Sequence, residues 1–136
     1  MKIHLLSGFL GSGKTTVIHQ ACNYLKKGEV RAAVITNDQG SRLVDTGLFE
    51  KLNIPNRQVS DGCFCCNYDH LENGVHSLIT EEQPKVIFAE SVGSCTDIVA
   101  TVMNPLLHFH PRTPVTLTAL VDVRLLKILL QPVTAA

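Results

Sequence analysis

The sequence predicts an α/β fold, a three-layer sandwich in which helices cover both faces of a mainly parallel sheet. Strand-like runs alternate with helix-like runs along the chain. The strand-like runs are nearly continuously apolar, as strands that are buried on both faces require. In addition, a glycine-rich loop over residues 8–13 joins the first predicted strand to the first predicted helix.

Five runs are predicted to be strands: Lys2–Leu6, Val30–Thr36, Arg57–Ser60, Lys85–Ala89 and Val115–Val121. Apolar residues at helical spacing predict a helix over Lys14–Lys27, which Gly28 ends. Two further helices are predicted by apolar positions at the same spacing, namely Leu71, Val75, Leu78 and Ile79, and then Ile98, Val99, Val102 and Met103. The second of these is expected to end at Pro105.

A last helix is predicted from Val123, and its leucines over Leu125–Leu130 would have few partners within the 136 residues. We therefore interpret residues 1–136 as the N-terminal portion of one domain from a longer or truncated protein. A small natural domain that ends here is the alternative. Loss of a later strand would leave an exposed sheet edge, which favours dimerisation or aggregation.

Charge and cysteine content exclude several classes of protein. Lys and Arg number 12, as do Asp and Glu, so no global basic field attracts nucleic acid or an anionic membrane. No apolar run reaches about 18 residues, so no membrane-spanning helix is expected. The cysteine count of 5 is odd and three lie within residues 63–66, which favours thiolate chemistry in a reducing, cytoplasmic compartment over a secreted disulfide framework.

Residues 8–15, GFLGSGKT, fit the phosphate-loop pattern G-x-x-x-x-G-K-[ST] in full. Its glycines let backbone N–H groups converge on phosphate oxygens, and the N-terminus of the following helix adds its positive end. Lys14 would neutralise β- and γ-phosphate charge, the Thr15 hydroxyl would bind Mg²⁺, and Thr16 would contact the α-phosphate. The alternative is a glycine-rich turn that binds nothing.

Glu90 opens the segment Glu90-Ser91-Val92-Gly93 directly after a predicted strand. It would hold Mg²⁺ through water, while the Gly93 amide would sense the γ-phosphate. The alternative is a helix cap at Ser91 or Ser94.

Asp38 follows the predicted strand Val30–Thr36. It would bind Mg²⁺ or orient the attacking water, or else it is a turn residue. The predicted nucleotide-binding residues are therefore Gly8, Gly11, Ser12, Gly13, Lys14, Thr15, Thr16 and Gly93. Lys14, Asp38 and Glu90 are the predicted catalytic residues, and Thr15, Asp38 and Glu90 the predicted magnesium ligands.

Cys63, Cys65 and Cys66 form a C-x-C-C cluster just before a predicted helix. The helix N-terminus is expected to lower the pKa of these thiols, and soft thiolates suit Zn²⁺, while Co²⁺ and Ni²⁺ are also accommodated. Three ligands leave one tetrahedral position open, which fits metal transfer better than a structural role. A redox-sensing or merely buried set of thiols is the alternative.

Four histidines are candidates for a fourth ligand, although each is more simply a surface residue: His70, His76, His108 and His110. Cys95 lies two residues after Gly93. We favour a position at the start of a helix for Cys95, and the alternative is a metal ligand that communicates with the nucleotide state. Cys22 is predicted to be buried in the first helix, and His4 to lie in the core or on a face of the sheet.

Four segments together resemble the CobW/HypB/UreG family of P-loop GTPases, the cobalt, nickel and zinc metallochaperones. The segments are residues 7–16, Asn37-Asp38-Gln39-Gly40 with Asp45, Asp61-Gly62-Cys63-Phe64-Cys65-Cys66, and Glu90-Ser91-Val92-Gly93. The last three resemble the family patterns N-E-x-G…D, G-C-x-C-C and E-x-x-G, and the order and spacing agree along residues 1–122. Cys65 matches the central cysteine usually implicated in metal binding.

The resemblance implies a P-loop GTPase that uses GTP and Mg²⁺ and delivers a transition metal to a client metalloenzyme or a cofactor-maturation protein. Intrinsic turnover would be slow, with a partner protein or a nucleotide-dependent homodimer as activator. The chain departs from the family at Asp38, where Glu is usual, and at Ser41, where many members have another Glu. The guanine-reading N-K-x-D motif is expected beyond residue 136, so base specificity rests on the resemblance alone.

Two other classes of function remain open at the level of sequence. An ATP-dependent small-molecule kinase would share the phosphate loop but leave the cysteines without metal. A redox or metal sensor would bind nucleotide and respond to thiol chemistry without hydrolysis.

Overall fold

The computed structural model describes residues 1–37, 44–60 and 62–131. Its strands are β1 (Lys2–Gly8), β2 (Ala32–Asn37), β3 (Asn56–Val59), β4 (Val86–Glu90) and β5 (Val115–Leu120). Its helices are α1 (Lys14–Lys27), α2 (Val44–Lys51), α3 (Tyr68–Glu82), the π-helix η1 (Val99–Met103), α4 (Asn104–Phe109) and α5 (Val123–Leu129). Across these described ranges, no helix is both long and apolar enough to cross a bilayer.

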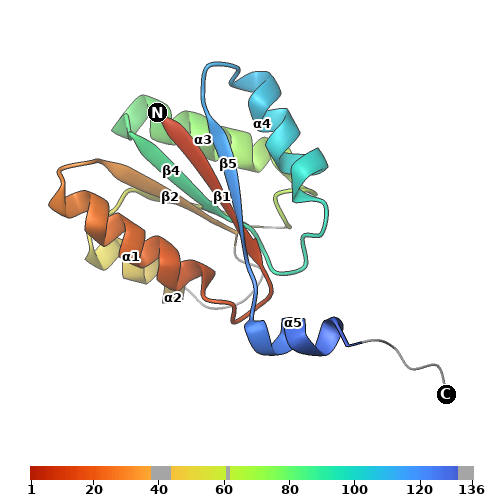
Figure 1. Ribbon diagram of the computed structural model, residues 1–136. Helices are drawn as coiled ribbons and strands as arrows, with labels where there is room; N and C mark the ends of the chain where they lie inside the picture. The colour runs from red at the N-terminus through yellow and green to blue at the C-terminus, as the bar shows by residue number, and fades with distance from the viewer. Residues whose placement is uncertain (38–43, 61, 132–136) are drawn as a thin grey trace.

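The five strands form one parallel sheet with the order β3-β2-β4-β1-β5. Helices α1 and α2 lie on one face of the sheet, and α3 and α4 lie on the other (Figure 1). This is the predicted three-layer arrangement. Each helical crossover returns the chain to the same end of the sheet, as parallel strands require.

Two hydrophobic cores fill the spaces between the layers. In β1, Leu5 packs into the core beneath α3, η1 and α4, whereas its neighbour Leu6 packs into the core beneath α1 and α2. In β2, Ile35 packs into the core beneath α3, η1 and α4, and Val34 packs into the core beneath α1 and α2. Successive strand side chains point to opposite faces, so the continuous apolar runs of the sequence are explained by burial on both faces.

The region around Pro105 differs from the prediction, because Pro105 does not end the helix. The chain forms a π-helix over Val99–Met103 and continues directly into α4, with Pro105 in the first turn of that helix. The Asn104 N–H donates to the Val99 carbonyl, which is the wider i to i−5 bond of a π-turn. Pro105 is tolerated because N–H groups in a first turn need no intrahelical acceptor.

Helix α2 is an element that the sequence analysis did not predict. Its Gly47 weakens the local helix signal, since glycine is a poor helix former. Phe49 nevertheless lies fully buried in the core beneath α1 and α2. The local sequence of this segment does not favour a helix clearly, and the packing of the Phe49 side chain into the core stabilises the helical conformation.

Helix α5 lies beyond β5, at the end of the sheet, with no buried side chain (Figure 1). Its N-cap is Asp122, whose carboxylate accepts from the Arg124 N–H at 2.8 Å. The prediction that the leucines of this helix have few partners is confirmed, since Leu129 and Leu130 are 64% and 72% exposed.

Two leucine-to-alanine substitutions test this division between core and surface. Leu5→Ala is expected to lower the free energy of unfolding by about 2–5 kcal/mol, because Leu5 is fully buried and its truncation leaves a cavity. Leu129→Ala is the matched control and is expected to change it by less than about 0.5 kcal/mol. Urea unfolding followed by circular dichroism measures both. Equal effects would contradict the described packing.

Candidate functional site

The carboxyl ends of the three central strands meet at one edge of the sheet. Glu90 of β4 lies in register with Leu6 of β1 on one side and with Thr36 of β2 on the other. The connections that follow these strands therefore begin beside one another. In parallel α/β sheets this edge is where ligands bind.

The phosphate loop follows β1 and is held in a curled conformation. Gly8, Gly11 and Gly13 have φ values of 144°, 78° and 93°, a region that L side chains rarely adopt. A Cβ atom on Gly8 would lie 2.4 Å from the Leu120 carbonyl oxygen, so only glycine fits there. Loop and helix α1 meet at Gly13, which precedes Lys14.

Lys14 and Ser12 give this loop the chemistry of an anion site. The Lys14 ammonium is buried and donates to the carbonyl oxygens of Gly8 at 2.7 Å and Phe9 at 3.2 Å. The Ser12 Oγ atom is buried and has no hydrogen-bond partner among the described residues. The first N–H groups of α1 have no intrahelical acceptors, and they lie at the positive end of the helix dipole. These groups fit the phosphates of a nucleotide.

Thr15 and Glu90 bring two oxygen-bearing side chains together from α1 and β4. The Thr15 hydroxyl donates to both carboxylate oxygens of Glu90, at 2.9 and 3.0 Å. A hydroxyl and a carboxylate are the hard oxygen ligands that Mg²⁺ prefers. The pair therefore fits a magnesium ion at the position that the sequence analysis predicts.

Gly93 lies directly against the backbone of the phosphate loop. A Cβ atom at this position would lie 2.7 Å from the Leu10 nitrogen and 3.1 Å from the Phe9 carbonyl carbon. The close approach depends on the absence of a side chain. The segment after β4 and the phosphate loop are therefore in direct contact at Gly93.

Ser91 does not cap a helix, which excludes one of the alternatives considered for this segment. It is 1% exposed, and both its N–H and its hydroxyl donate to the Leu6 carbonyl oxygen, at 2.9 and 3.0 Å. Asp97 contacts the following helix instead, since its Oδ1 accepts from the Ala100 N–H at 3.4 Å. Ser91 thus fixes the start of the Glu90–Gly93 segment to β1.

Asp38 lies outside the described residues, and its predicted role in magnesium binding or catalysis stays a prediction. Its neighbour Asn37 is a residue whose contribution the sequence analysis missed. The Asn37 side chain donates to the carbonyl oxygens of Val59 at 3.1 Å and Gly62 at 2.6 Å, and accepts from the Phe64 N–H at 2.9 Å. A buried amide in this position ties the end of β2 to the loop that carries the cysteines.

The three cysteines form a compact cluster of sulfur atoms. The sulfurs of Cys63, Cys65 and Cys66 all lie within 4.8 Å of one another. Cys63 and Cys66 are 2.8 Å apart and Cys65 and Cys66 are 3.9 Å apart, measured between Sγ atoms. A turn closed by the Cys66 N–H on the Cys63 carbonyl, at 3.0 Å, folds the cluster before α3 begins. Soft sulfur ligands at this spacing fit a transition metal.

Cys95 joins the cluster from a different part of the chain. Its Sγ atom lies 3.3 Å from that of Cys65, and its side chain is buried. The helix that follows begins only at residue 98, so the favoured interpretation of Cys95 as a helix-start residue is wrong. The signal in the sequence was its position two residues after Gly93.

The thiols of the cluster differ in pKa, contrary to the expectation that the helix N-terminus would lower them all. Burial opposes ionisation of Cys63, but hydrogen bonds with the Cys65 and Cys66 thiols outweigh it and lower its pKa to about 7. The hydrogen bond to Cys63 and then burial raise the pKa of Cys65 to about 12. Hydrogen bonds to Cys63 and Cys65 raise the pKa of Cys66 to about 11. The contacts that favour the thiolate form of Cys63 therefore disfavour ionisation of Cys65 and Cys66.

None of the histidines in the described part of the chain lies within 4.8 Å of all three sulfurs. His110 contacts the Glu72 carboxylate at 2.7 Å, while His70, His76 and His108 are exposed. His4 is half-buried on the sheet, between the hydroxyls of Thr116 and Thr118. Cys22 is 2% exposed, which confirms that it is a buried residue of the first helix.

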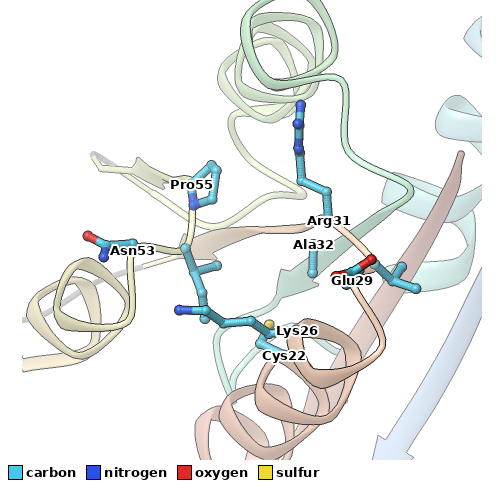
Figure 2. A pocket seen from close by; sticks show the side chains of 9 residues that line it. Cys22, Lys26, Glu29, Arg31, Ala32, Asn53 and Pro55 are labelled. Atoms are coloured by element: carbon cyan, nitrogen blue, oxygen red, sulfur yellow. The ribbon is translucent and has the colours of Figure 1, made fainter.

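A cavity of about 200 Å³ lies at the opposite end of the sheet (Figure 2). It is lined by Cys22, Lys26, Glu29, Val30, Arg31, Ala32, Asn53, Ile54 and Pro55. The cations beside it are already engaged: Lys26 donates to the Leu52 carbonyl at 2.9 Å and Arg31 to the Glu82 carbonyl at 2.7 Å. No predicted nucleotide or metal ligand lines this cavity, so the candidate site is the edge that holds the phosphate loop and the cysteines.

Comparison with known proteins identifies relatives of the chain. Residues 2–128 match the family model for CobW/HypB/UreG, nucleotide-binding domain. The chain is 30% identical over 93 residues to the zinc chaperone YeiR and 31% identical over 96 residues to the zinc chaperone YjiA, both of Escherichia coli (strain K12). These alignments cover 68% and 69% of this chain but only 28% and 30% of the relatives. The chain therefore spans less than a third of their length.

Solved structures resemble the fold at lower identity. HypB from Helicobacter pylori, in complex with nickel, has a TM-score of 0.57 and 14% identity, covering 88% of this chain and 79% of that chain. The signal recognition particle receptor FtsY from Elizabethkingia anophelis has a TM-score of 0.64 and 17% identity, and the match covers 86% of this chain and 41% of that chain. These similarities confirm the predicted P-loop fold with its mainly parallel sheet.

Substitution of Gly93 tests whether the segment after β4 contacts the phosphate loop as described. Gly93→Ala would place a Cβ 2.7 Å from the Leu10 nitrogen, so the loop backbone must shift. Affinity for a fluorescent GTP analogue is expected to fall by about tenfold or more, equivalent to about 1.4 kcal/mol. Gly47→Ala is the control, because a Cβ there meets no atom within 4 Å. Unchanged affinity in Gly93→Ala would contradict the described contact.

The uneven ionisation of the thiols is testable in metal-free, reduced protein. Because the pKa of Cys63 is lowered to about 7, ultraviolet thiolate absorbance is expected to rise as the pH passes through that value. Cys63→Ser is expected to remove this step, whereas Cys22→Ser is expected to retain it, since burial raises the pKa of Cys22 to about 11. A first thiolate appearing only near the ordinary thiol pKa of about 8.5 would contradict the described hydrogen bonds.

Proposed function

The chain belongs to the CobW/HypB/UreG family of nucleotide-binding domains, and we propose that it is the N-terminal portion of the GTPase domain of a metallochaperone. It binds and hydrolyses GTP, binds a transition metal at its cysteine cluster, and couples hydrolysis to metal delivery. The observation that carries this proposal is the placement of three sulfurs, mutually within 4.8 Å, at the same sheet edge as the phosphate loop.

The nucleotide lies across the phosphate loop and the start of α1. The N–H groups around Gly11, Gly13 and Thr16 hold phosphate oxygens, and the Ser12 hydroxyl, which is buried without a partner among the described residues, donates to one of them. Lys14 leaves the Gly8 and Phe9 carbonyls to neutralise β- and γ-phosphate charge. Binding therefore replaces hydrogen bonds from the Lys14 ammonium to neutral carbonyls with hydrogen bonds to negatively charged phosphate oxygens.

Magnesium binding involves Thr15, Glu90 and Asp38. The Thr15 hydroxyl, which now donates to Glu90, turns its oxygen to the ion, and the Glu90 carboxylate holds the ion through water. Bound Mg²⁺ supplies charge neutralisation at the reacting phosphates. Asp38 orients water or completes the ion's ligands, and the Gly93 N–H senses the γ-phosphate. Catalysis is by positioning and electrostatics.

Zinc is the proposed metal, with cobalt and nickel as the other candidates. Thiolates are soft ligands that suit all three, and Zn²⁺ takes the tetrahedral arrangement that clustered cysteines provide. The curated relatives YeiR and YjiA are described as zinc chaperones, which favours the same metal here. Cys63, Cys65 and Cys66 are the ligands, and their deprotonation couples binding to proton release.

The client is a metalloenzyme or a cofactor-maturation protein that accepts the metal. Intrinsic hydrolysis is slow, because none of the segments over residues 8–16, 37–40 and 90–93 contains an arginine to stabilise transition-state charge. A partner protein, or a second copy of the chain in a nucleotide-dependent homodimer, supplies the activation.

A redox sensor is the second candidate function, favoured by one observation. Two pairs of sulfurs, Cys63 with Cys66 and Cys65 with Cys95, lie 2.8 and 3.3 Å apart, close enough to form disulfides with modest side-chain movement. In that case a thiol oxidant, and not a metal, changes the nucleotide site.

An anaerobic Co²⁺ titration of the reduced chain separates the two candidates. We expect intense thiolate-to-cobalt charge-transfer bands, lost or strongly weakened in Cys65→Ser and unchanged in Cys22→Ser, whose thiol lies in α1 apart from the cluster. Zn²⁺ is expected to displace the cobalt, and Mg²⁺-GTP to change the affinity. The absence of thiolate bands, with nucleotide affinity dependent on oxidation instead, would contradict the metallochaperone and support the sensor.

A further inference from the structure

Cys95 stands next to the three-cysteine cluster but outside its sequence motif. The Cys95 and Cys65 sulfurs are 3.3 Å apart, and Cys95 is 8% exposed. The group of sulfurs mutually within 4.8 Å comprises Cys63, Cys65 and Cys66, so Cys95 approaches the cluster from its Cys65 side. A fourth thiol, from a second connection of the sheet, thus contacts the cluster at Cys65.

The distances suit a tetrahedral centre better than a chance contact. Four sulfurs bound to one ion at about 2.3 Å lie about 3.8 Å from one another. The Sγ–Sγ distances are 2.8 Å from Cys63 to Cys66, 3.9 Å from Cys66 to Cys65 and 3.3 Å from Cys65 to Cys95, and they bracket this value. An ion at the cluster would gain a fourth ligand by drawing the Cys95 sulfur inward from its position beside Cys65.

The segment that carries Cys95 also touches the nucleotide site at two points. Glu90, five residues before Cys95, accepts from the Thr15 hydroxyl at the start of α1. Gly93, two residues before it, abuts the backbone of Phe9 and Leu10 in the phosphate loop. The turn that presents Cys95 is closed by its own N–H on the Val92 carbonyl, at 3.2 Å. The six residues 90–95 therefore contact the Thr15 hydroxyl at one end, through Glu90, and the Cys65 sulfur at the other, through Cys95.

The geometry points to Cys95 as a fourth thiolate ligand of the metal site, one that reports the state of the nucleotide site through the Glu90–Cys95 segment. This inference rests on the proposed function. With Cys95 bound, the site is a closed four-sulfur site that retains its metal. With Cys95 withdrawn, three thiolates and one open position remain, which is the form suited to transfer.

Rearrangement at the phosphates supplies the movement. When Mg²⁺-GTP binds, Thr15 and Glu90 would hold the ion in place of their mutual hydrogen bond, and the Gly93 N–H would face the γ-phosphate. Because Ser91 is held to Leu6 of β1, a displacement of Glu90 ends at Ser91, and the movement that reaches Cys95 starts at Gly93, two residues before it. Nucleotide and metal then alter each other's affinity by the same factor, as linkage requires.

X-ray absorption spectroscopy of the zinc-loaded wild-type chain tests the ligand assignment without any substitution. Four sulfur neighbours are expected in at least one of the two states, nucleotide-free or bound to a non-hydrolysable GTP analogue with Mg²⁺. Three sulfurs with one nitrogen or oxygen in both states would overturn the role of Cys95 and leave the three-cysteine site intact. No sulfur in either state would remove the proposed metal site itself, and this inference with it.

A Co²⁺ titration of Cys95→Ser tests the coupling. Charge-transfer intensity per cobalt is expected to fall by roughly a quarter, since one of four thiolates is lost, and cobalt affinity to fall by about tenfold or more. In the wild type the GTP analogue is expected to change cobalt affinity by about fivefold or more, and in Cys95→Ser that effect is expected to vanish. Circular dichroism checks that the variant is folded.

Ser94→Ala is the matched control, because Ser94 is exposed and lies in the same turn. It is expected to keep the wild-type intensity, affinity and nucleotide effect. A Cys95→Ser protein with wild-type spectra and an undiminished nucleotide effect would overturn the inference. Loss of the nucleotide effect in Ser94→Ala as well would assign the coupling to the turn and not to the thiolate.

Discussion

The parallel, in-register pairing of β2, β4 and β1 is the constraint on which both candidate sites depend. Because Glu90 is paired with Leu6 and with Thr36, three connections leave the sheet side by side. One is the phosphate loop, one follows β2, and one runs on to Cys95. A shift of β4 by one residue would turn Glu90 away from Thr15 and reverse the faces that Ile87 and Phe88 bury. The two hydrophobic cores therefore enforce the register that the chemistry requires.

Asn37 extends this order from the sheet to the cysteines. A loop that holds several thiols close together has few apolar side chains of its own to fix it, and unpaired backbone groups in it would be costly. The amide of Asn37 binds the carbonyls of Val59 and Gly62 and the N–H of Phe64, while the fully buried Phe64 ring anchors the loop in the core. The cysteine loop is thus preorganised from the same strand end as the acidic segment.

The sequence analysis succeeded where local pattern and tertiary structure agree. The bounds of α1 match, because apolar spacing, the preceding glycine loop and Gly28 all indicate the same helix. It failed where distant contacts decide. Phe49 makes α2 a helix through burial, and a π-turn before Asn104 moves Pro105 into a tolerated position. Cys95 lies 30 residues from Cys65, so only the topology of the sheet could bring their sulfurs together.

The protonation of the cluster follows from that same crowding and bears on how a metal would leave. Only Cys63 has a lowered pKa, because its hydrogen bonds with the Cys65 and Cys66 thiols outweigh the effect of burial, and the same contacts raise the pKa of Cys65 and of Cys66. A divalent ion bound by these sulfurs must expel the protons, and those protons compete for the sulfurs whenever a ligand is withdrawn. In the described structure the sulfurs of Cys63, Cys65 and Cys66 instead contact one another, so each has a polar partner before any ion is bound.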